Sequence, residues 1–166
     1  MTVVVADTCP VIFLAKLSRL ALIQGVFPGS ILLPEAVRQE LDQENTPLVE
    51  LRRIRAFLRG CRVEAVRNPQ FPTSVLSLAD RCVLTLAGNH QECVILTDDG
   101  LLRRVAEAER FRVAGTLGVL IRARRAGLVA RPETVRALEE LVGQHRFRIS
   151  VELYQEALRQ IASTDA

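Results

Sequence analysis

Residues 3–17, VVVADTCPVIFLAKL, decide the fold of this chain. The valines and alanine at 3–6 form a short apolar, β-branched run, which is typical of a strand buried in a parallel sheet. Apolar residues then recur at helical spacing over residues 11–24, and Pro10 suits the first turn of a helix, where its missing N–H has no partner to lose. Asp7 lies where strand becomes helix, and this position raises the question of what its carboxylate binds.

The composition indicates one globular domain. The chain has 166 residues, of which 49% are hydrophobic, enough for a single packed core. We expect a single domain over residues 1–166, with C-terminal helices at 132–163 packed on it or on a partner. The net charge is +3 and the pI is about 8.9, a mild excess that is compatible with a nucleic-acid partner without requiring one.

The sequence predicts a cytoplasmic protein. Asp7 interrupts the first apolar run, so the N-terminus does not resemble a secretory signal, and no run reaches the length of a transmembrane helix. The cysteines lie among apolar residues without C-x-x-C spacing, so we expect core thiols in a reducing compartment rather than a zinc site or disulfides. They are Cys9, Cys61, Cys82 and Cys93.

Strands and helices alternate along the rest of the chain. Strands are predicted at 30–33, 61–66, 93–97 and 112–115, and helices at 34–41, 47–59, 77–90, 101–109 and 116–127, followed by two C-terminal helices. Ser77 and Ser150 are the predicted N-caps of their helices. Alternation of this kind implies right-handed crossovers and an α/β fold, in which a parallel sheet is covered on both faces.

Five acidic residues fall at one pole of the predicted sheet. Asp7, Asp98 and Asp99 follow strands, Asp80 opens the helix before the 93–97 strand, and Glu40 lies in the helix after the second strand. Ligands of parallel sheets collect at the carboxyl ends of the strands. Clustered carboxylates repel one another unless a divalent cation compensates them, and Mg²⁺ or Mn²⁺ prefers oxygen ligands. The pattern favours metal-assisted hydrolysis of a phosphodiester.

Each acid also has a simpler interpretation, taken alone. Asp7 could be only a helix N-cap, Asp98 and Asp99 only a turn, and Asp80 could favour the helix dipole while Glu40 is solvated. Their shared pole argues for a site, since independent caps seldom gather at one end of a sheet.

Other aspartate-based and phosphate-binding sites do not match the sequence. A receiver domain needs a lysine near its last strand, whereas the lone lysine is Lys16 in the first helix. A haloacid-dehalogenase-type phosphatase needs Asp-x-Asp after the first strand, and Asp7 is followed by Thr8 and Cys9. A P-loop needs a Gly-rich turn ending in Lys-Ser/Thr, which the chain lacks.

The motifs ADTCPVIFLAKL, ILLPEAVRQEL, LSLADRCVLTLA, VILTDDGLLRRVAE and VAGTLGVLIRARRAGLV occur in this order, and RFRISVELYQEAL follows them. This arrangement resembles the PIN-domain family, in particular its toxin-like prokaryotic branch. The resemblance implies a three-layer α/β/α sandwich with a central parallel sheet. It also implies a Mg²⁺- or Mn²⁺-dependent endoribonuclease of the VapC type, which would leave a 5′-phosphate and a 3′-hydroxyl.

The resemblance assigns roles to the acids. Asp7, Glu40, Asp80 and Asp99 match the catalytic set, and the metal ligands would be Asp7, Asp80, Asp98 and Asp99, with Asp99 favoured over Asp98 as the principal ligand. Relatives of this branch often carry glutamate where this chain has Asp80, which would weaken or re-space a metal site. The alternative is therefore a PIN-fold binding module with little or no activity.

The resemblance and the charge pattern also suggest partners. RNA would be bound by Thr8, Lys16, Arg103 and Arg104, with further contacts from Arg122, Arg124 and Arg125. The apolar, Arg-rich helices at 47–59 and 117–126 would offer surfaces for a homodimer and for a small antitoxin-like protein. No membrane partner is expected.

Overall fold

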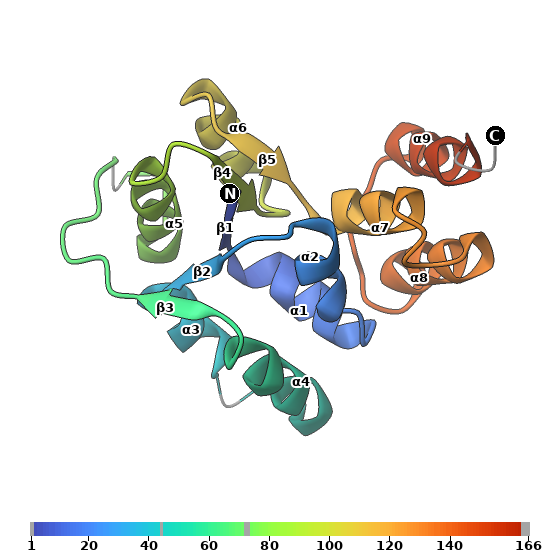
Figure 1. Ribbon diagram of the computed structural model, residues 1–166, viewed down its shortest axis with the longest axis horizontal. Helices are drawn as coiled ribbons and strands as arrows, with labels where there is room; N and C mark the ends of the chain where they lie inside the picture. Colours follow the sequence, from blue (N-terminus) through green and yellow to red (C-terminus); the bar gives the residue numbers. More distant parts are fainter. Residues whose placement is uncertain (1, 44, 72–73, 164–166) are drawn as a thin grey trace.

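The computed structural model describes residues 2–43, 45–71 and 74–163. In this part of the chain five strands form one sheet in the order β3-β2-β1-β4-β5, and every neighbouring pair is parallel (Figure 1). The strands are β1 (Val3–Ala6), β2 (Ile31–Pro34), β3 (Arg62–Glu64), β4 (Cys93–Leu96) and β5 (Arg112–Ala114). The predicted parallel α/β fold is confirmed.

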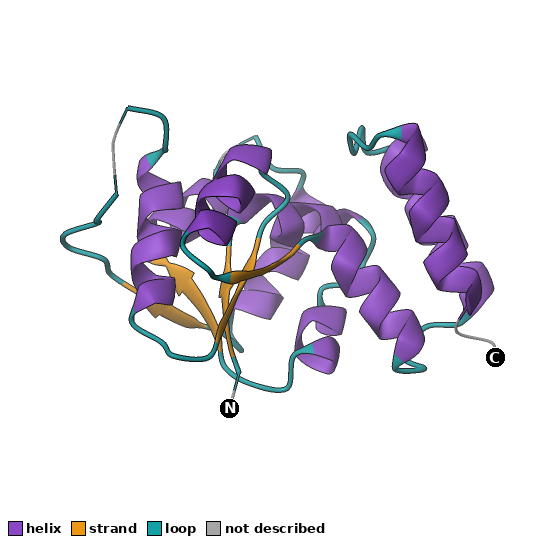
Figure 2. Cartoon of the chain, turned by 90° about the horizontal axis from the view of Figure 1, so that it is seen from above, coloured by secondary structure: helices purple, strands orange, loops and turns teal. Residues whose placement is uncertain are grey.

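Helices cover both faces of the sheet. Figure 1 shows α1, α3 and α4 on one side and α5 and α6 on the other, and Figure 2 shows the strands enclosed between helices. The helices are α1 (Thr8–Lys16), α2 (Ala21–Val26), α3 (Glu35–Leu41), α4 (Leu48–Leu58), α5 (Leu78–Gly88), α6 (Gly100–Ala108), α7 (Thr116–Arg125), α8 (Arg131–Gly143) and α9 (Val151–Ala162). This arrangement is the predicted α/β/α sandwich.

The central strands are buried on both faces, as their composition predicts. β1 pairs with β2 on one side and with β4 on the other, and Val5 lies between Leu32 and Ile95 in this register. All three side chains are fully buried. A strand in this position needs apolar residues throughout, which accounts for the unbroken VVVA and CVIL runs.

The predicted helix over residues 11–24 is wrong, because the structure has two helices there. α1 ends at Lys16 and Ser18 adopts a left-handed conformation with φ of 58°. The Arg19 N–H donates to the Leu14 carbonyl (2.8 Å) and the Ser18 N–H to the Ala15 carbonyl (3.1 Å), which is a Schellman motif. Glycine usually takes this position, so the serine conceals the break in the sequence.

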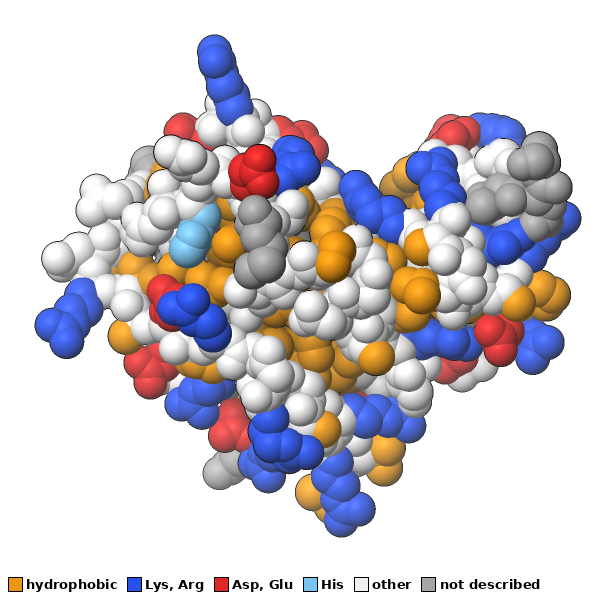
Figure 3. Space-filling view, in the orientation of Figure 1, with side chains coloured by type: hydrophobic (Ala, Val, Ile, Leu, Met, Phe, Trp, Pro, Cys, Tyr) orange, Lys and Arg blue, Asp and Glu red, His pale blue; other side chains and the backbone are white. Residues whose placement is uncertain are grey.

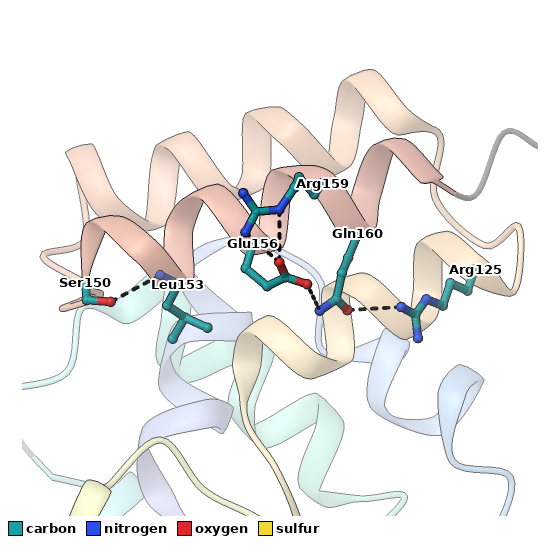
Figure 4. A network of polar contacts seen from close by, with 6 residues as sticks. All are labelled: Arg125, Ser150, Leu153, Glu156, Arg159 and Gln160. Atoms are coloured by element: carbon teal, nitrogen blue, oxygen red, sulfur yellow. Dashed lines mark hydrogen bonds and ion pairs between the residues drawn. The ribbon is translucent and has the colours of Figure 1, made fainter.

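The C-terminal helices form a small second core. α8 and α9 pack on α7 around the buried residues Leu117, Ile121, Leu138, Ala157 and Ile161. Polar contacts join the outer side of this unit, where Arg125 of α7 donates to Gln160 of α9 and Glu156 accepts from Arg159 (Figure 4). The predicted surface at 117–126 is therefore wrong, since most apolar residues of α7 are covered inside the chain.

Two further sequence-based expectations can be compared with the structure. The predicted N-caps are confirmed, because the Ser77 hydroxyl accepts from the Asp80 N–H and the Ser150 hydroxyl accepts from the Leu153 N–H. Of the expected core thiols, Cys82 and Cys93 are buried, but Cys61 is half-buried and Cys9 is exposed. Cys9 is the second residue of α1, and its side chain lies on the exposed side of that helix. No helix of the described residues has the length and apolar character needed to cross a membrane.

Candidate functional site

The site lies where the order of the sheet reverses. The chain passes from β1 to β2 and β3 on one side, then returns to β4 and β5 on the other. This switch point at the carboxyl ends of β1 and β4, here called the crevice, is the place where open α/β sheets bind their ligands. Asp7 follows β1 directly, and its N–H donates to the Leu96 carbonyl at the end of β4 (2.9 Å).

Asp7 is a buried carboxylate with two hydrogen-bond donors. Only 5% of the residue is exposed. The Thr97 hydroxyl donates to Oδ2 (2.8 Å) and the Thr8 N–H donates to Oδ1 (2.7 Å), so Asp7 also caps α1. Burial raises the pKa of Asp7 to about 6, against the lowering effect of these two hydrogen bonds, and nearby negative charge adds to the rise. The simple capping role is thus real, but it does not account for a buried carboxylate with a raised pKa.

Glu40 and Asp80 supply that negative charge. Both raise the pKa of Asp7 through their proximity. Glu40 of α3 is oriented by the Thr8 hydroxyl, which donates to its Oε2 (2.6 Å). Asp80 of α5 forms a capping box in which the Ser77 N–H donates to its Oδ2 (2.9 Å). The structure therefore brings together Asp7 from the start of α1, Glu40 from the last turn of α3 and Asp80 from the first turn of α5, which are distant in sequence.

Asp98 and Asp99 point to different helices. Asp99 is exposed and caps α6, where its Oδ1 accepts from the N–H groups of Leu101 (2.9 Å) and Leu102 (2.7 Å). Asp98 accepts from the N–H (2.8 Å) and the hydroxyl (2.5 Å) of Thr116 at the start of α7. Burial raises the pKa of Asp98, although these bonds and Arg103 lower it. Each carboxylate therefore has a structural partner at the rim of the crevice.

Thr97 is a site residue that the sequence analysis missed. Its hydroxyl is fully buried, donates to Asp7 and accepts from the Asp99 N–H (3.0 Å). One side chain thus links the carboxyl ends of β1 and β4. The available signal was a hydroxyl residue closing an apolar strand directly before two aspartates.

The predicted RNA-binding residues divide into two groups. Arg103 donates to the Thr97 carbonyl (3.1 Å), and the Arg104 guanidinium folds back over Gly100 beside Asp99, so both lie at the crevice. Thr8 lies there too, although its hydroxyl binds Glu40.

Other predicted contacts lie away from the acids. Lys16 is the last residue of α1, roughly 12 Å along the axis from the end that Asp7 caps. Arg124 and Arg125 occupy the last turn of α7, whereas Asp98 contacts its first residue. The structure does not bring these three residues to the acidic cluster.

The Cys9 thiol is not available as a metal ligand, which leaves oxygen atoms as the donors of the site. Cys9 is exposed as a residue, but its sulfur is partly buried, and this burial raises the pKa of the thiol to about 12, with further increases from the negative charges of Asp7, Asp98, Asp99 and Glu40. The thiol therefore stays protonated at neutral pH, and the donors at the crevice are carboxylate and hydroxyl oxygens. Oxygen donors suit hard cations such as Mg²⁺ and Mn²⁺.

The acids do not form a ready-made chelating cluster. Across residues 2–43, 45–71 and 74–163, no group of three or more His, Cys, Asp and Glu side chains is close enough to hold a metal ion. Glu40 is turned to Thr8 and Asp80 to Ser77. The donor chemistry fits a hard divalent cation, and binding one requires these two side chains to turn toward Asp7.

The comparisons with known proteins agree with the fold. A family model described as DUF3368, a PIN domain, matches residues 3–163, which includes every strand and helix named above. A search of curated proteins finds no match. Because the family model covers nearly the whole chain, this protein belongs to the PIN-domain family.

Proposed function

We propose that this protein is a divalent-metal-dependent ribonuclease that hydrolyses phosphodiester bonds. The observation that carries the proposal is Asp7, a buried carboxylate at the switch point whose pKa is raised to about 6 beside Glu40 and Asp80. Such an arrangement is costly without a compensating positive charge, and it is typical of sites that hold a cation. Membership of the PIN-domain family supports a nuclease fold.

Asp7, Asp80 and Asp99 would hold a Mg²⁺ or Mn²⁺ ion, with Glu40 and Asp98 close to it. When bound, such an ion lowers the pKa of water and stabilises negative charge on the phosphate. The chain's own residues do the remaining work. Thr97 and the Thr8 N–H orient Asp7, and Glu40, once turned from the Thr8 hydroxyl toward Asp7, would orient the attacking water.

The reaction is a hydrolysis. The water oxygen bonds to phosphorus and the bond from phosphorus to the 3′-oxygen breaks, so that a 5′-phosphate and a 3′-hydroxyl remain. The proton lost by the water would pass to a carboxylate, a role that we assign to Glu40, and the leaving oxygen takes a proton from solvent.

The direct test is metal-dependent cleavage of RNA by the wild-type chain and by Asp7→Asn. We expect cleavage by the wild type with Mn²⁺ and none above background for the variant, because the isosteric amide keeps an acceptor for the Thr8 N–H and loses the charge. Glu139→Gln on α8 is the matched control, since it removes an exposed carboxylate far from the crevice. Equal cleavage by Asp7→Asn and the wild type would exclude Asp7 from the reaction.

A binding module without catalysis is the second candidate. It is favoured by the capping roles of Asp80 and Asp99, which engage both carboxylates with their own helices. The two functions differ in a titration: an inactive module binds RNA whether or not Mn²⁺ is present, whereas the nuclease binds Mn²⁺ and loses that binding with Asp7→Asn.

We also propose a toxin-antitoxin role, with a homodimer and a small antitoxin protein as partners. An apolar groove of about 400 Å³ supports a protein partner and lies between the α1–α2 turn and α4, lined by Leu20, Ala21, Ala56 and Phe57. Leu48 and Val49 at the start of α4 are also exposed, by 71% and 58%. Light scattering of the purified chain tests the dimer, and a monomer at all concentrations would contradict it.

A further inference from the structure

A second groove begins at Asp98 and runs away from the acidic cluster. Its volume is about 460 Å³. One wall comes from α6 and the β5–α7 junction, and the other comes from the connection between α8 and α9 together with the start of α9. The C-terminal helices thus complete a channel whose first residue belongs to the site described above.

The groove is positively charged. Arginines line it from three separate segments: Arg103 of α6, Arg122 of α7 and Arg148 of the α8–α9 connection. Asp98 is the acidic residue among the described lining side chains, and its oxygens already accept from Thr116. Figure 3 shows basic side chains on both sides of the hollow between the sheet and α9.

Two of the arginines are held in place by contacts within the chain. Arg103 donates to the Thr97 carbonyl (3.1 Å) and forms an ion pair with Glu107 (3.7 Å). The Arg122 guanidinium lies over the Phe27 ring, 5.4 Å from its centroid. Positioned guanidinium groups of this kind suit phosphate oxygens, which they bind through two parallel donors.

The floor between the arginines is apolar. It consists of Leu117, Ile121, Phe147 and Leu153. Phe147 is fixed by an edge-on contact with Phe13, with ring centroids 5.0 Å apart and an interplanar angle of 85°. Glycines let the backbone approach closely: a Cβ on Gly115 would lie 2.5 Å from Asp98 Oδ1, and one on Gly118 would lie 3.0 Å from the Arg122 guanidinium.

We propose that this groove binds single-stranded RNA, with Arg122 and Arg148 on the phosphates and the apolar floor against the bases. The inference rests on the proposed function, because the groove would lead the strand to the acids. A positively charged groove with an aromatic side chain on which a base can stack, here Phe147, is the pattern of single-strand binding sites. The groove's volume of about 460 Å³ lies within the range of clefts that bind ligands. The α8–α9 connection thereby acquires a role in substrate binding.

The test measures RNA binding without cleavage. A fluorescein-labelled mixed-sequence 12-nucleotide RNA is titrated with the full chain in the Asp7→Asn background, with EDTA present, by anisotropy at several salt concentrations. We expect the double variant Arg122→Gln/Arg148→Gln to bind about 10-fold more weakly at low salt, and the slope of log K against log salt to fall by about 1.4, the value for two lost phosphate contacts on a single strand.

Two controls make the outcome specific. Arg146→Gln removes an equal charge from the same connection, but Arg146 does not line the groove, so binding should be unchanged. Arg148→Gln alone changes an exposed side chain and should fold normally, which keeps the test valid if the Arg122 change disturbs packing on Phe27. The same strand annealed to its complement should bind more weakly than the single strand.

The results separate the groove from the nuclease. The proposed groove would be refuted if Arg148→Gln and the double variant bound the single-stranded RNA with wild-type affinity, or if the duplex bound as tightly as the single strand. Normal Mn²⁺-dependent cleavage beside that result would leave the proposed nuclease intact. Groove-dependent binding without any metal-dependent cleavage would support the groove and refute the nuclease.

Discussion

At the residue scale, Asp7 is both the N-cap of α1 and a buried carboxylate at the end of the central strand, two roles that are usually held by different residues. It caps α1 by accepting from the Thr8 N–H, and it stays buried at the end of the central strand, where the Thr97 hydroxyl holds it. A cap alone would be satisfied by a solvated carboxylate. Burial at this position costs stability when the group is ionised, and a site that binds a cation recovers that cost on binding.

The first prediction concerns the pH dependence of stability. The pKa of Asp7 is about 6 in the folded chain and 3.8 in the unfolded one, so the folded state binds the proton more tightly and loses stability as pH rises from about 4 to 6. Asp7→Asn should therefore raise the free energy of unfolding by about 3 kcal/mol above pH 6 and change it little near pH 4. Urea denaturation in EDTA at both pH values measures this difference.

Asp42→Asn is the control for that measurement. The hydrogen bond and charge of Arg55 lower the pKa of Asp42, so its ionised form favours the folded state and its removal cannot stabilise the chain at neutral pH. A loss of stability in Asp7→Asn at pH 7 would show that Asp7 is chiefly a structural cap.

The second prediction separates Asp98 from Asp99. We expect Asp99→Asn to abolish Mn²⁺-dependent cleavage, since asparagine still caps α6 but contributes no charge. Asp98→Asn should reduce cleavage by about 10–100-fold, the range for residues that support a metal ligand, because Asp98 is bound to Thr116. Calorimetric titration of Mn²⁺ into both variants decides the assignment, and loss of binding in Asp98→Asn alone would reverse it.

At the scale of elements, the start of α7 packs closely against the residues that follow β4. Thr116 donates twice to Asp98, and Gly115 precedes it with no room for a side chain. The Arg103 guanidinium and the Thr97 carbonyl would each lie 3.1 Å from an added Cβ. The junction between β5 and α7 therefore depends on glycine for space rather than for an unusual backbone angle.

The third prediction follows from this junction. Gly115→Ala should lower the free energy of unfolding by about 1–3 kcal/mol and reduce cleavage, because the methyl group displaces Asp98. Gly143→Ala at the end of α8 is the matched control, since its Cβ would meet nothing within 4 Å and alanine favours the helix by up to about 1 kcal/mol. Equal stability of the two variants, measured by thermal unfolding, would show that the junction can relax.

At the scale of the whole molecule, the chain has a main core and a smaller C-terminal one. The main cluster encloses the sheet, and the second joins α7, α8 and α9 around Leu138. α7 contributes to both clusters, so it connects them. The small cluster has fewer buried residues, and its opening should cost less than unfolding of the sheet.

The fourth prediction tests this difference in stability. Leu138 is fully buried, so Leu138→Ala should destabilise the small cluster by about 2–4 kcal/mol. Native-state hydrogen exchange should then show faster exchange in α8 and α9 and near-normal protection in β1 and β4. Uniform loss of protection across the chain would instead indicate one cooperative unit. Leu138→Ala should also weaken RNA binding in the proposed groove, because Phe147 and Leu153 near the start of α9 line it.

Much of this architecture could be predicted from the sequence, because burial and helix capping leave local signals. The apolar runs of β1 and β4 identify central strands, and Ser77 and Ser150 identify helix starts. The same local signals can also miss a feature. The break after α1 went unpredicted because apolar spacing continues through it, and because serine rather than glycine takes the left-handed position at Ser18.

The sequence by itself determined which acids stand at strand ends, and hence that a polar site exists at one pole of the sheet. Only the tertiary structure decided their neighbours: Thr8 beside Glu40, Thr97 between Asp7 and Asp99, and Thr116 on Asp98. Strand and helix periodicity follow from residues a few positions apart, whereas these contacts join segments up to 90 residues apart. Such contacts depend on strand order and crossover, which side-chain spacing along the chain does not encode.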